Sequence, residues 1–164
     1  MKRFFMALGL LGCVSTAQAL EVGDQAPCVV LNQISAQNTE AEHCIRDHGP
    51  AQAYTLIEFF SVTCGACMEN HPILNQVAND ISATTLSRQV AVDRDEKAIR
   101  NYVSANRKDF PLEVALDFDR DAKKAYGVVE TPTTFILDAN QKVIYKHAGV
   151  FSPSDVAQIK ELVK

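Results

Sequence analysis

Two cysteines three residues apart, Cys64 and Cys67, closely follow the most apolar run of the chain, residues 54–61. The run holds a single acid, Glu58, and its density of apolar side chains predicts a central strand that is buried on both faces. After Cys64 the pattern becomes helical, and these apolar side chains share one helix face: Ile73, Leu74, Val77 and Ile81. The cysteine pair is therefore expected where a buried strand ends and a helix begins.

The other segments alternate between strand and helix patterns. Further strands are expected at residues 29–31, 90–92, 112–116, 133–137 and 143–146. Further helices are expected at residues 96–105, at 119–126 before Gly127, and from Pro153 onward with Ser152 as the cap. The polar stretch that ends at Pro50 is expected to be irregular. Strands separated by helices and closed by a hairpin predict an α/β domain, with a central mixed β-sheet flanked by helices on both faces.

The first nineteen residues have the order of a secretory signal peptide. Basic Met1–Arg3 precede an apolar stretch, and Ala17-Gln18-Ala19 forms a small-x-small cleavage site, so residues 20–164 are expected to form the mature domain. Two alternatives are a buried first helix and a lipoprotein box at Leu10–Cys13, in which an acylated Cys13 would anchor the protein to a membrane. Export predicts a periplasmic location, where disulfides persist.

The charge of the chain argues against nucleic acid as a partner. The 16 basic residues are outnumbered by 20 acidic ones, and removal of residues 1–19 takes away Lys2 and Arg3, so the mature charge is 14 minus 20, or −6. No stripe of positive charge is left to follow a phosphate backbone. The length of 164 residues suits one domain, and no run reaches the roughly 18 to 20 apolar residues of a membrane span.

The cysteine pair has the placement of an exchange site. A thiolate is the reactive form of cysteine, and the free N–H groups and dipole of a helix N-terminus favour negative charge on Cys64. Cys67 comes one turn later on the same side and is expected to be less exposed, which suits it to resolve a mixed disulfide. A static disulfide and half of a zinc site are the alternatives, although zinc would need a second ligand pair.

Glu58 lies six residues before Cys64, on the same strand face as residues 60 and 62. A buried, unpaired carboxylate costs several kcal/mol, so the acid is expected to be neutral or to have a partner. From below the helix start it could accept the proton of Cys67. The alternative is an acid at a strand edge with its carboxylate in solvent.

The combined motifs resemble the thioredoxin fold. They comprise Glu58-Phe59, the cysteine pair, Pro72, the Ala125–Val128 segment, Thr131-Pro132-Thr133 and the closing hairpin. The resemblance implies that Cys64 is the nucleophile, Cys67 the resolving thiol and Glu58 the buried acid. It also implies a cis-proline at Pro132, beside which, with Thr131, a substrate strand binds.

More narrowly, the start at Val22–Pro27, the insert at Asp93–Leu116 and Leu116–Asp119 are similar to exported thiol-disulfide oxidoreductases of the TlpA and ResA group. This implies an N-terminal β extension, protein thiols and disulfides as substrates, and an exported or membrane electron donor, with no cofactor. It also implies the reducing direction, as in cytochrome c maturation or repair of protein cysteines. Thr63, Ala66 and Glu130 depart from the group, which usually has Trp, Pro and Gly there.

Cys28 and Cys44 form a second pair in the N-terminal β region, and a structural disulfide between them is expected in an oxidising compartment. The alternatives are a second exchange pair that relays electrons to Cys64 and a metal site with His43 and His48. The other histidines, His71 and His147, are expected to be exposed rather than ligands.

Two functions of other classes remain as alternatives. The Cys64 and Cys67 thiolates could hold Cu(I), although no methionine cluster supports a copper module. A thiol peroxidase would use one activated cysteine in a Pro- and Thr-containing loop, which the residues before Cys64 do not supply.

Overall fold

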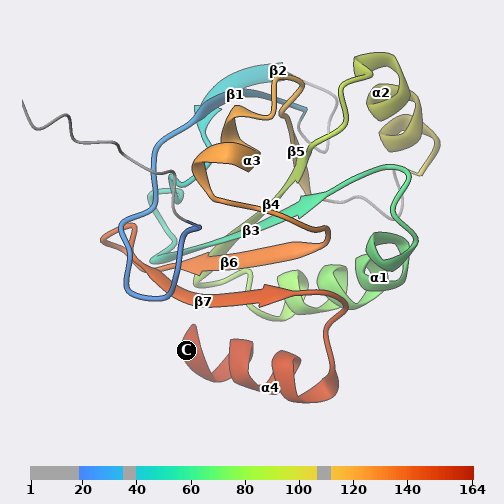
Figure 1. Ribbon diagram of the computed structural model, residues 1–164. Coiled ribbons are helices and arrows are strands. Elements are labelled where there is room, and N and C mark those ends of the chain that lie inside the picture. The colour runs from blue at the N-terminus through green and yellow to red at the C-terminus, as the bar shows by residue number, and fades with distance from the viewer. Residues whose placement is uncertain (1–18, 35–39, 107–111) are drawn as a thin grey trace, which may run out of the picture.

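The computed structural model describes residues 19–34, 40–106 and 112–164. Their strands are β1 Val30–Ile34, β2 Glu40–Cys44, β3 Tyr54–Phe60, β4 Thr85–Ala91, β5 Glu113–Leu116, β6 Thr133–Leu137 and β7 Val143–Ala148. Their helices are α1 Gly65–Asp80, α2 Glu96–Ala105, α3 Asp121–Ala125 and α4 Pro153–Leu162. The strands form one sheet in the order β2-β1-β5-β4-β3-β6-β7, shown in Figure 1.

The sheet is mixed. β3, β4 and β5 run parallel, while β6 pairs antiparallel with β3 and β7 antiparallel with β6. At the other edge β1 pairs antiparallel with β5, and β2 antiparallel with β1. The predicted closing hairpin and the predicted N-terminal β extension are both confirmed.

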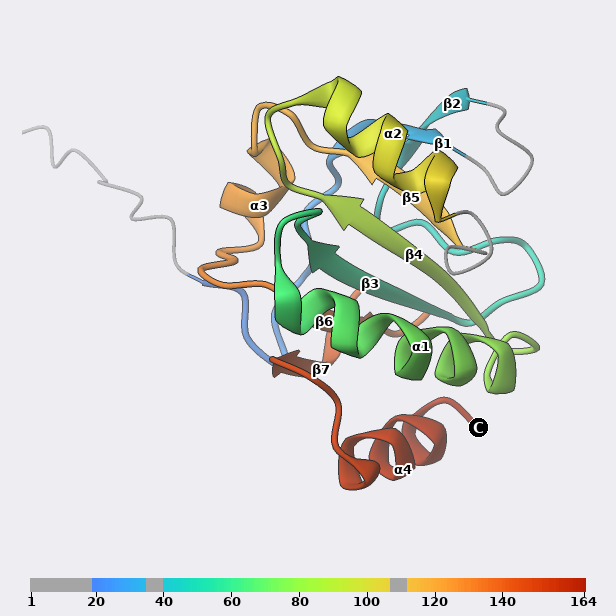
Figure 2. The same ribbon diagram turned by 90° about the vertical axis from the view of Figure 1, so that its right-hand side faces the viewer.

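Helices cover both faces of the sheet, as predicted. On β3, Phe60 packs on the face that α1 and α2 cover, and Leu56 packs with α1 and α4. Phe59 points to the opposite face, where it packs with Ala122 and Tyr126 around α3. Figures 1 and 2 show α3 apart from the other three helices. Alternation along β3 therefore divides the core into two layers.

Local sequence signals set the ends of several helices. The Asp95 side chain accepts a hydrogen bond from the Ala98 amide and caps α2. Ser152 and Asp155 form a reciprocal capping box at the start of α4, which begins at Pro153 as predicted. Gly127 follows α3 with a φ of +61°, a backbone conformation that glycine adopts without strain.

The expectation that the chain is irregular up to Pro50 is wrong, because β2 lies within that stretch. Four of the five residues of β2 are exposed, so the strand has no alternating apolar face, and pairing with β1 is what makes it a strand. The predicted signal peptide and Cys13 lie outside the described residues except for Ala19. Within the described ranges, every helix is too short or too polar to reach across a bilayer.

Candidate active site

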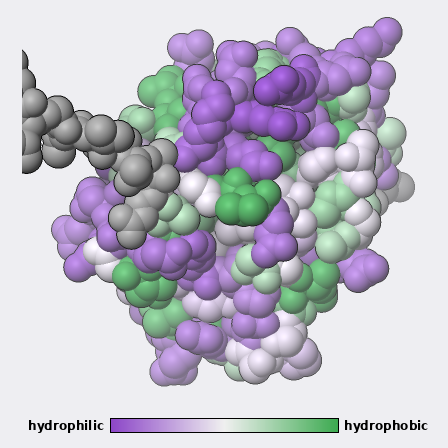
Figure 3. All heavy atoms as spheres, in the orientation of Figure 1, coloured by the Kyte–Doolittle hydropathy of each residue, from purple (hydrophilic) through white to green (hydrophobic). Residues whose placement is uncertain are grey.

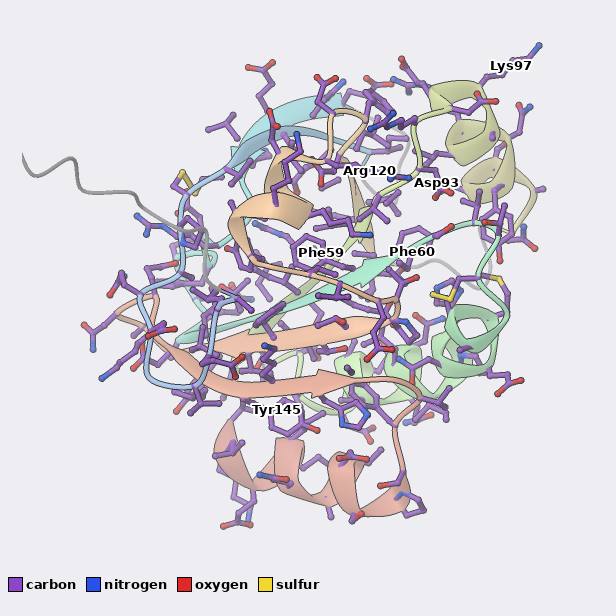
Figure 4. All side chains as sticks on the ribbon, in the orientation of Figure 1. Phe59, Phe60, Asp93, Lys97, Arg120 and Tyr145 are labelled. Atoms are coloured by element: carbon purple, nitrogen blue, oxygen red, sulfur yellow. A yellow bond between two sulfur atoms is a disulfide. The ribbon has the colours of Figure 1, made fainter. Side chains whose placement is uncertain are left out.

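Cys64 and Cys67 lie at the junction predicted for them. Cys64 is the N-cap of α1, and its Sγ accepts a hydrogen bond from the Cys67 amide at 3.1 Å. A disulfide joins the two residues, with the Cα atoms 5.2 Å apart, and Figure 4 shows it beside the start of α1. Cys64 is partly exposed, whereas Cys67 is fully buried. An incoming thiol or disulfide therefore reaches the sulfur of Cys64 first.

The loop before β6 lies beside this disulfide. The carbonyl oxygen of Thr131 is 3.3 Å from the Cys64 Sγ, and the Thr131–Pro132 peptide bond is cis. The Pro132 carbonyl accepts a hydrogen bond from the Gly149 amide at 2.8 Å, and the Thr133 hydroxyl donates to the Glu130 carbonyl at 2.8 Å. The structure thus brings Thr131 and Pro132 next to Cys64, 67 residues away in sequence.

Asp93 holds the loop between β3 and the cysteines. Its Oδ1 accepts a hydrogen bond from the Ser61 hydroxyl at 2.7 Å, and its Oδ2 accepts one from the Val62 amide at 2.9 Å. The Ser61 Oγ in turn accepts from the Thr63 amide at 3.2 Å. Asp93 follows β4, on the strand end where the active-site loop also lies (Figure 4). No local sequence pattern marks this role of Asp93, because its partners lie 32 and 31 positions earlier.

Glu58 is fully buried under α1, so the expectation of a buried acid with partners fits better than the solvent-facing alternative. Its Oε1 accepts a hydrogen bond from Asn70 Nδ2 at 2.8 Å, and its Oε2 accepts one from Gln89 Nε2 at 2.7 Å. Asn70 is fixed in turn by the Phe151 amide, which donates to its Oδ1 at 2.8 Å. Two amide side chains from α1 and β4 thus hold the carboxyl group.

Burial raises the pKa of Glu58 from its ordinary value of 4.5 to about 7, and the hydrogen bonds from Gln89 and Asn70 act in the opposite direction. The Oε1 of Gln89 is buried and has no hydrogen-bond partner among the described residues. Rotation of the Gln89 amide would turn that acceptor toward a protonated Glu58. The Gln89 amide can therefore hydrogen-bond to the Glu58 carboxyl group in either of its protonation states near neutral pH.

His71 is buried, and the expectation that it is exposed is wrong. Its Nε2 lies 4.0 Å from Glu58 Oε2, and its ring packs edge to face with Phe60 at a centroid distance of 5.3 Å. Phe60 also packs in the same cluster as Cys67. His71 and Phe60 therefore connect the buried carboxyl group to the resolving cysteine. The expected exposure of His147 is also wrong, because that residue is half-buried and 3.3 Å from Asp155.

The polar residues around Glu58 could not be read from local patterns. Asn70 and His71 stand inside a helix, Gln89 stands in a strand, and none of the three belongs to a motif. The one available signal was Glu58 itself, since an acid inside an apolar strand requires polar partners from neighbouring elements.

Cys28 and Cys44 are also joined by a disulfide, with the Cα atoms 5.4 Å apart. It lies near the start of β1, on the opposite side of the molecule from the disulfide at α1 (Figure 4). The buried Arg88 donates hydrogen bonds to the carbonyls of Cys44 and Ile45 at 3.0 and 2.9 Å. In the described part of the chain, no three His, Cys, Asp or Glu side chains gather into a metal-binding group.

Comparison with known proteins points to one family. A family model described as Redoxin matches residues 21–163. The chain is 27% identical over 140 residues to thiol-disulfide oxidoreductase ResA of Bacillus cereus, an alignment that covers 84% of this chain and 76% of that protein. The similarity to the ResA group expected from the motifs is confirmed.

Solved structures share the fold. A structure from Chlorobium tepidum described as a thiol:disulfide interchange protein DsbE matches with a TM-score of 0.68 at 24% identity, over 87% of this chain and 95% of that chain. A 2-Cys peroxiredoxin of Plasmodium vivax matches with a TM-score of 0.69 at 14% identity, over 87% and 95%. At these identities the likeness shows the fold alone, and it confirms the predicted thioredoxin-like fold.

Proposed function

This chain belongs to the redoxin family and is a thiol-disulfide oxidoreductase of the ResA type, and we propose that it acts as an exported reductant of protein disulfides. The observation that carries the proposal is the placement of Cys64. Its sulfur is partly exposed at the start of α1, receives a hydrogen bond from the Cys67 amide, and lies against the Thr131 carbonyl. When reduced, a sulfur so placed is stabilised as a thiolate that can attack a client disulfide. When oxidised, the same sulfur is exposed to attack by an incoming thiolate.

In the first step, the Cys64 thiolate attacks one sulfur of a client disulfide. The client S–S bond breaks, a bond between Cys64 and the client forms, and the second client sulfur leaves as a thiolate that takes a proton from solvent. Thr131 and Pro132 border the Cys64 sulfur, so the client backbone is proposed to lie along them.

In the second step, Cys67 gives its proton to Glu58 and attacks the sulfur of Cys64. The Cys64–Cys67 disulfide forms, and the client leaves with both of its sulfurs reduced, having gained two electrons. With a pKa of about 7, Glu58 is partly ionised at neutral pH and is able to take that proton. A dithiol donor, exported or in a membrane, must then reduce the enzyme again.

Export is part of the proposal and rests on the signal-like residues 1–19. The proposed mature chain begins at Leu20, a buried residue whose backbone nitrogen donates a hydrogen bond to the Tyr126 carbonyl at 3.3 Å. N-terminal sequencing of the protein from the periplasm is expected to begin at Leu20. An acylated Cys13 at the N-terminus would instead establish the lipoprotein alternative.

The redox direction is tested by equilibrating the Cys64–Cys67 pair with glutathione and trapping the free thiols. A reductant is expected to have a potential nearer that of thioredoxin, about −270 mV, than that of DsbA, about −120 mV. The same protein, supplied with a dithiol, should reduce a protein disulfide. A potential near that of DsbA would contradict the reducing role, although not the exchange chemistry.

The Cys28–Cys44 disulfide is proposed to be structural. It closes a loop with a sequence separation of 16, so loss of both sulfurs in a Cys28→Ser/Cys44→Ser variant is expected to lower the free energy of unfolding by about 3 kcal/mol. Chemical denaturation of the oxidised proteins measures this difference. Client reduction below the melting temperature should persist, because the two disulfides lie on opposite sides of the molecule. A variant of unchanged stability that stops turning over would instead support the electron relay.

A further inference from the structure

A hollow of about 450 Å³ lies beside α3, and Ala19, the last residue of the proposed signal peptide, also lines it. Four cationic side chains line it: Arg94, Arg120, Lys123 and Lys124. Arg94 belongs to the β4–α2 connection, Arg120 precedes α3, and the two lysines lie in the last turn of α3; the parallel ends of β4 and β5 bring these segments together. The hollow is therefore a basic site on a chain whose net charge is −4.

The four cations differ in their partners. Lys124 pairs with Asp121 at 3.2 Å, and the Arg120 Nε donates a hydrogen bond to the Val92 carbonyl at 3.1 Å. Arg94 and Lys123 have no ion pair with any carboxylate of the described residues. Three of the four positive charges thus have no carboxylate partner among the described residues, and the side chains of Arg94 and Lys123 also make no hydrogen bond there, so these two are open to an incoming anionic group.

The other wall of the hollow is apolar. It is made by Val128 and by Val129, whose exposed fraction of 88% is the highest of the large apolar side chains described. Figure 3 shows a hydrophobic spot bordered by the hydrophilic surface over α3. An exposed valine beside unpaired cations suits a ligand that is both apolar and acidic, which a polypeptide segment provides.

The hollow borders the active site along the chain. Val129 precedes Thr131 by two residues, so their Cα atoms are at most about 7 Å apart. The Thr131 carbonyl lies 3.3 Å from the Cys64 sulfur. A second hollow of about 160 Å³ continues past Val129 and includes Glu130 and Thr133 on the approach to the cis-proline strand. A client whose sulfur reaches Cys64 therefore lies within a few residues' length of Val129, at the edge of the basic hollow.

We propose that this hollow binds an acidic segment of the client protein that flanks its reactive cysteine. An apolar client side chain lies against Val129, and client carboxylates lie at Arg94 and Lys123. The proposal rests on the disulfide exchange proposed above, for which it specifies the class of substrate. Attraction between opposite charges at the rim of a binding site acts chiefly on the rate of encounter and is weakened by salt. The preference for acidic clients should therefore be larger at low ionic strength.

The test compares the reduction of two mixed-disulfide peptides that differ only in flanking residues, one with Asp and Val and the other with Lys and Val. The wild-type protein is expected to reduce the acidic peptide with a higher kcat/KM, and the difference should shrink in 0.5 M salt. Arg94→Glu and Lys123→Glu are each expected to lower kcat/KM for the acidic peptide about fivefold, the equivalent of about 1 kcal/mol.

Lys97→Glu is the matched control, because it makes the same change of charge at a side chain that projects outward from α2 and does not line the hollow (Figure 4). It is expected to keep the preference for the acidic peptide. Equal effects of all three variants, or no preference in the wild type, would overturn the proposal. Reduction of a small neutral disulfide distinguishes loss of the exchange function from loss of client binding at the hollow. If the wild type fails to reduce it, the exchange function is wrong, whereas its normal reduction without a charge preference refutes the hollow alone.

Discussion

Replacement of Cys64 by serine is expected to abolish reduction of client disulfides, whereas replacement of Cys67 is expected to arrest it halfway. Without the Cys64 sulfur no mixed disulfide forms, and turnover should fall to the rate of the added reductant alone. In Cys67→Ser the first attack still takes place, but no thiol is left to release the client. The partly exposed Cys64 and the buried Cys67 predict this asymmetry.

Non-reducing mass spectrometry of the two variants after incubation with a client measures the outcome. Cys67→Ser should accumulate an adduct at Cys64, and Cys64→Ser should show none at either position. Ala66→Ser is a matched control, since it places a hydroxyl in the same exposed turn without removing a sulfur. Full turnover in Cys64→Ser, or adducts on Cys67 in preference to Cys64, would be incompatible with the proposed roles.

The fold was predictable where one element carries its own signal. Helix α2 occupies Glu96–Ala105, as its apolar spacing indicates, and β3 was visible as a dense apolar run. Strand β2 was not visible, because its residues are mostly exposed and it exists through pairing with β1. Edge strands of this kind are specified by a neighbouring strand and not by their own periodicity.

The same distinction applies to the site. The cysteine pair is a local motif at a strand-to-helix junction, so the sequence located it. The polar partners of Glu58 come from two other elements, α1 and β4, and the burial of His71 depends on how α1 lies on β3. Tertiary packing sets these contacts, and a single sequence carries no local record of them. The basic hollow likewise joins residues 94 and 123, which the sequence separates.

Glu58→Gln is expected to stabilise the oxidised protein at alkaline pH. In the native protein the pKa of Glu58 is about 7, against an ordinary value of 4.5, so the folded state holds a proton that the unfolded state has lost between these values. Stability from this group is complete below about pH 4.5 and is lost as the pH rises to about 7, a change of about 3 kcal/mol. The variant lacks that loss, and the Gln89 Oε1 is available to accept from its new amide.

Denaturation of the oxidised wild type and of Glu58→Gln at pH 4 and pH 8 measures the difference. The two proteins should be similar at pH 4, and the variant should be more stable at pH 8. Glu69→Gln, on the exposed side of α1, makes the same change of charge and should not alter the dependence on pH. Identical pH dependence in the wild type and Glu58→Gln would show that Glu58 does not hold a proton in the folded state at neutral pH.

The same substitution is expected to slow the second chemical step and to leave the first unchanged. A mixed disulfide at Cys64 can be prepared and its release followed, and without a carboxylate to take the proton of Cys67 that release should slow about a hundredfold at pH 7. The release rate of the wild type should rise with pH through about 7, and this inflection should be missing in Glu58→Gln. Glu58→Asp should restore part of the rate. A release rate and pH profile equal to those of Glu69→Gln would assign Glu58 a structural role only.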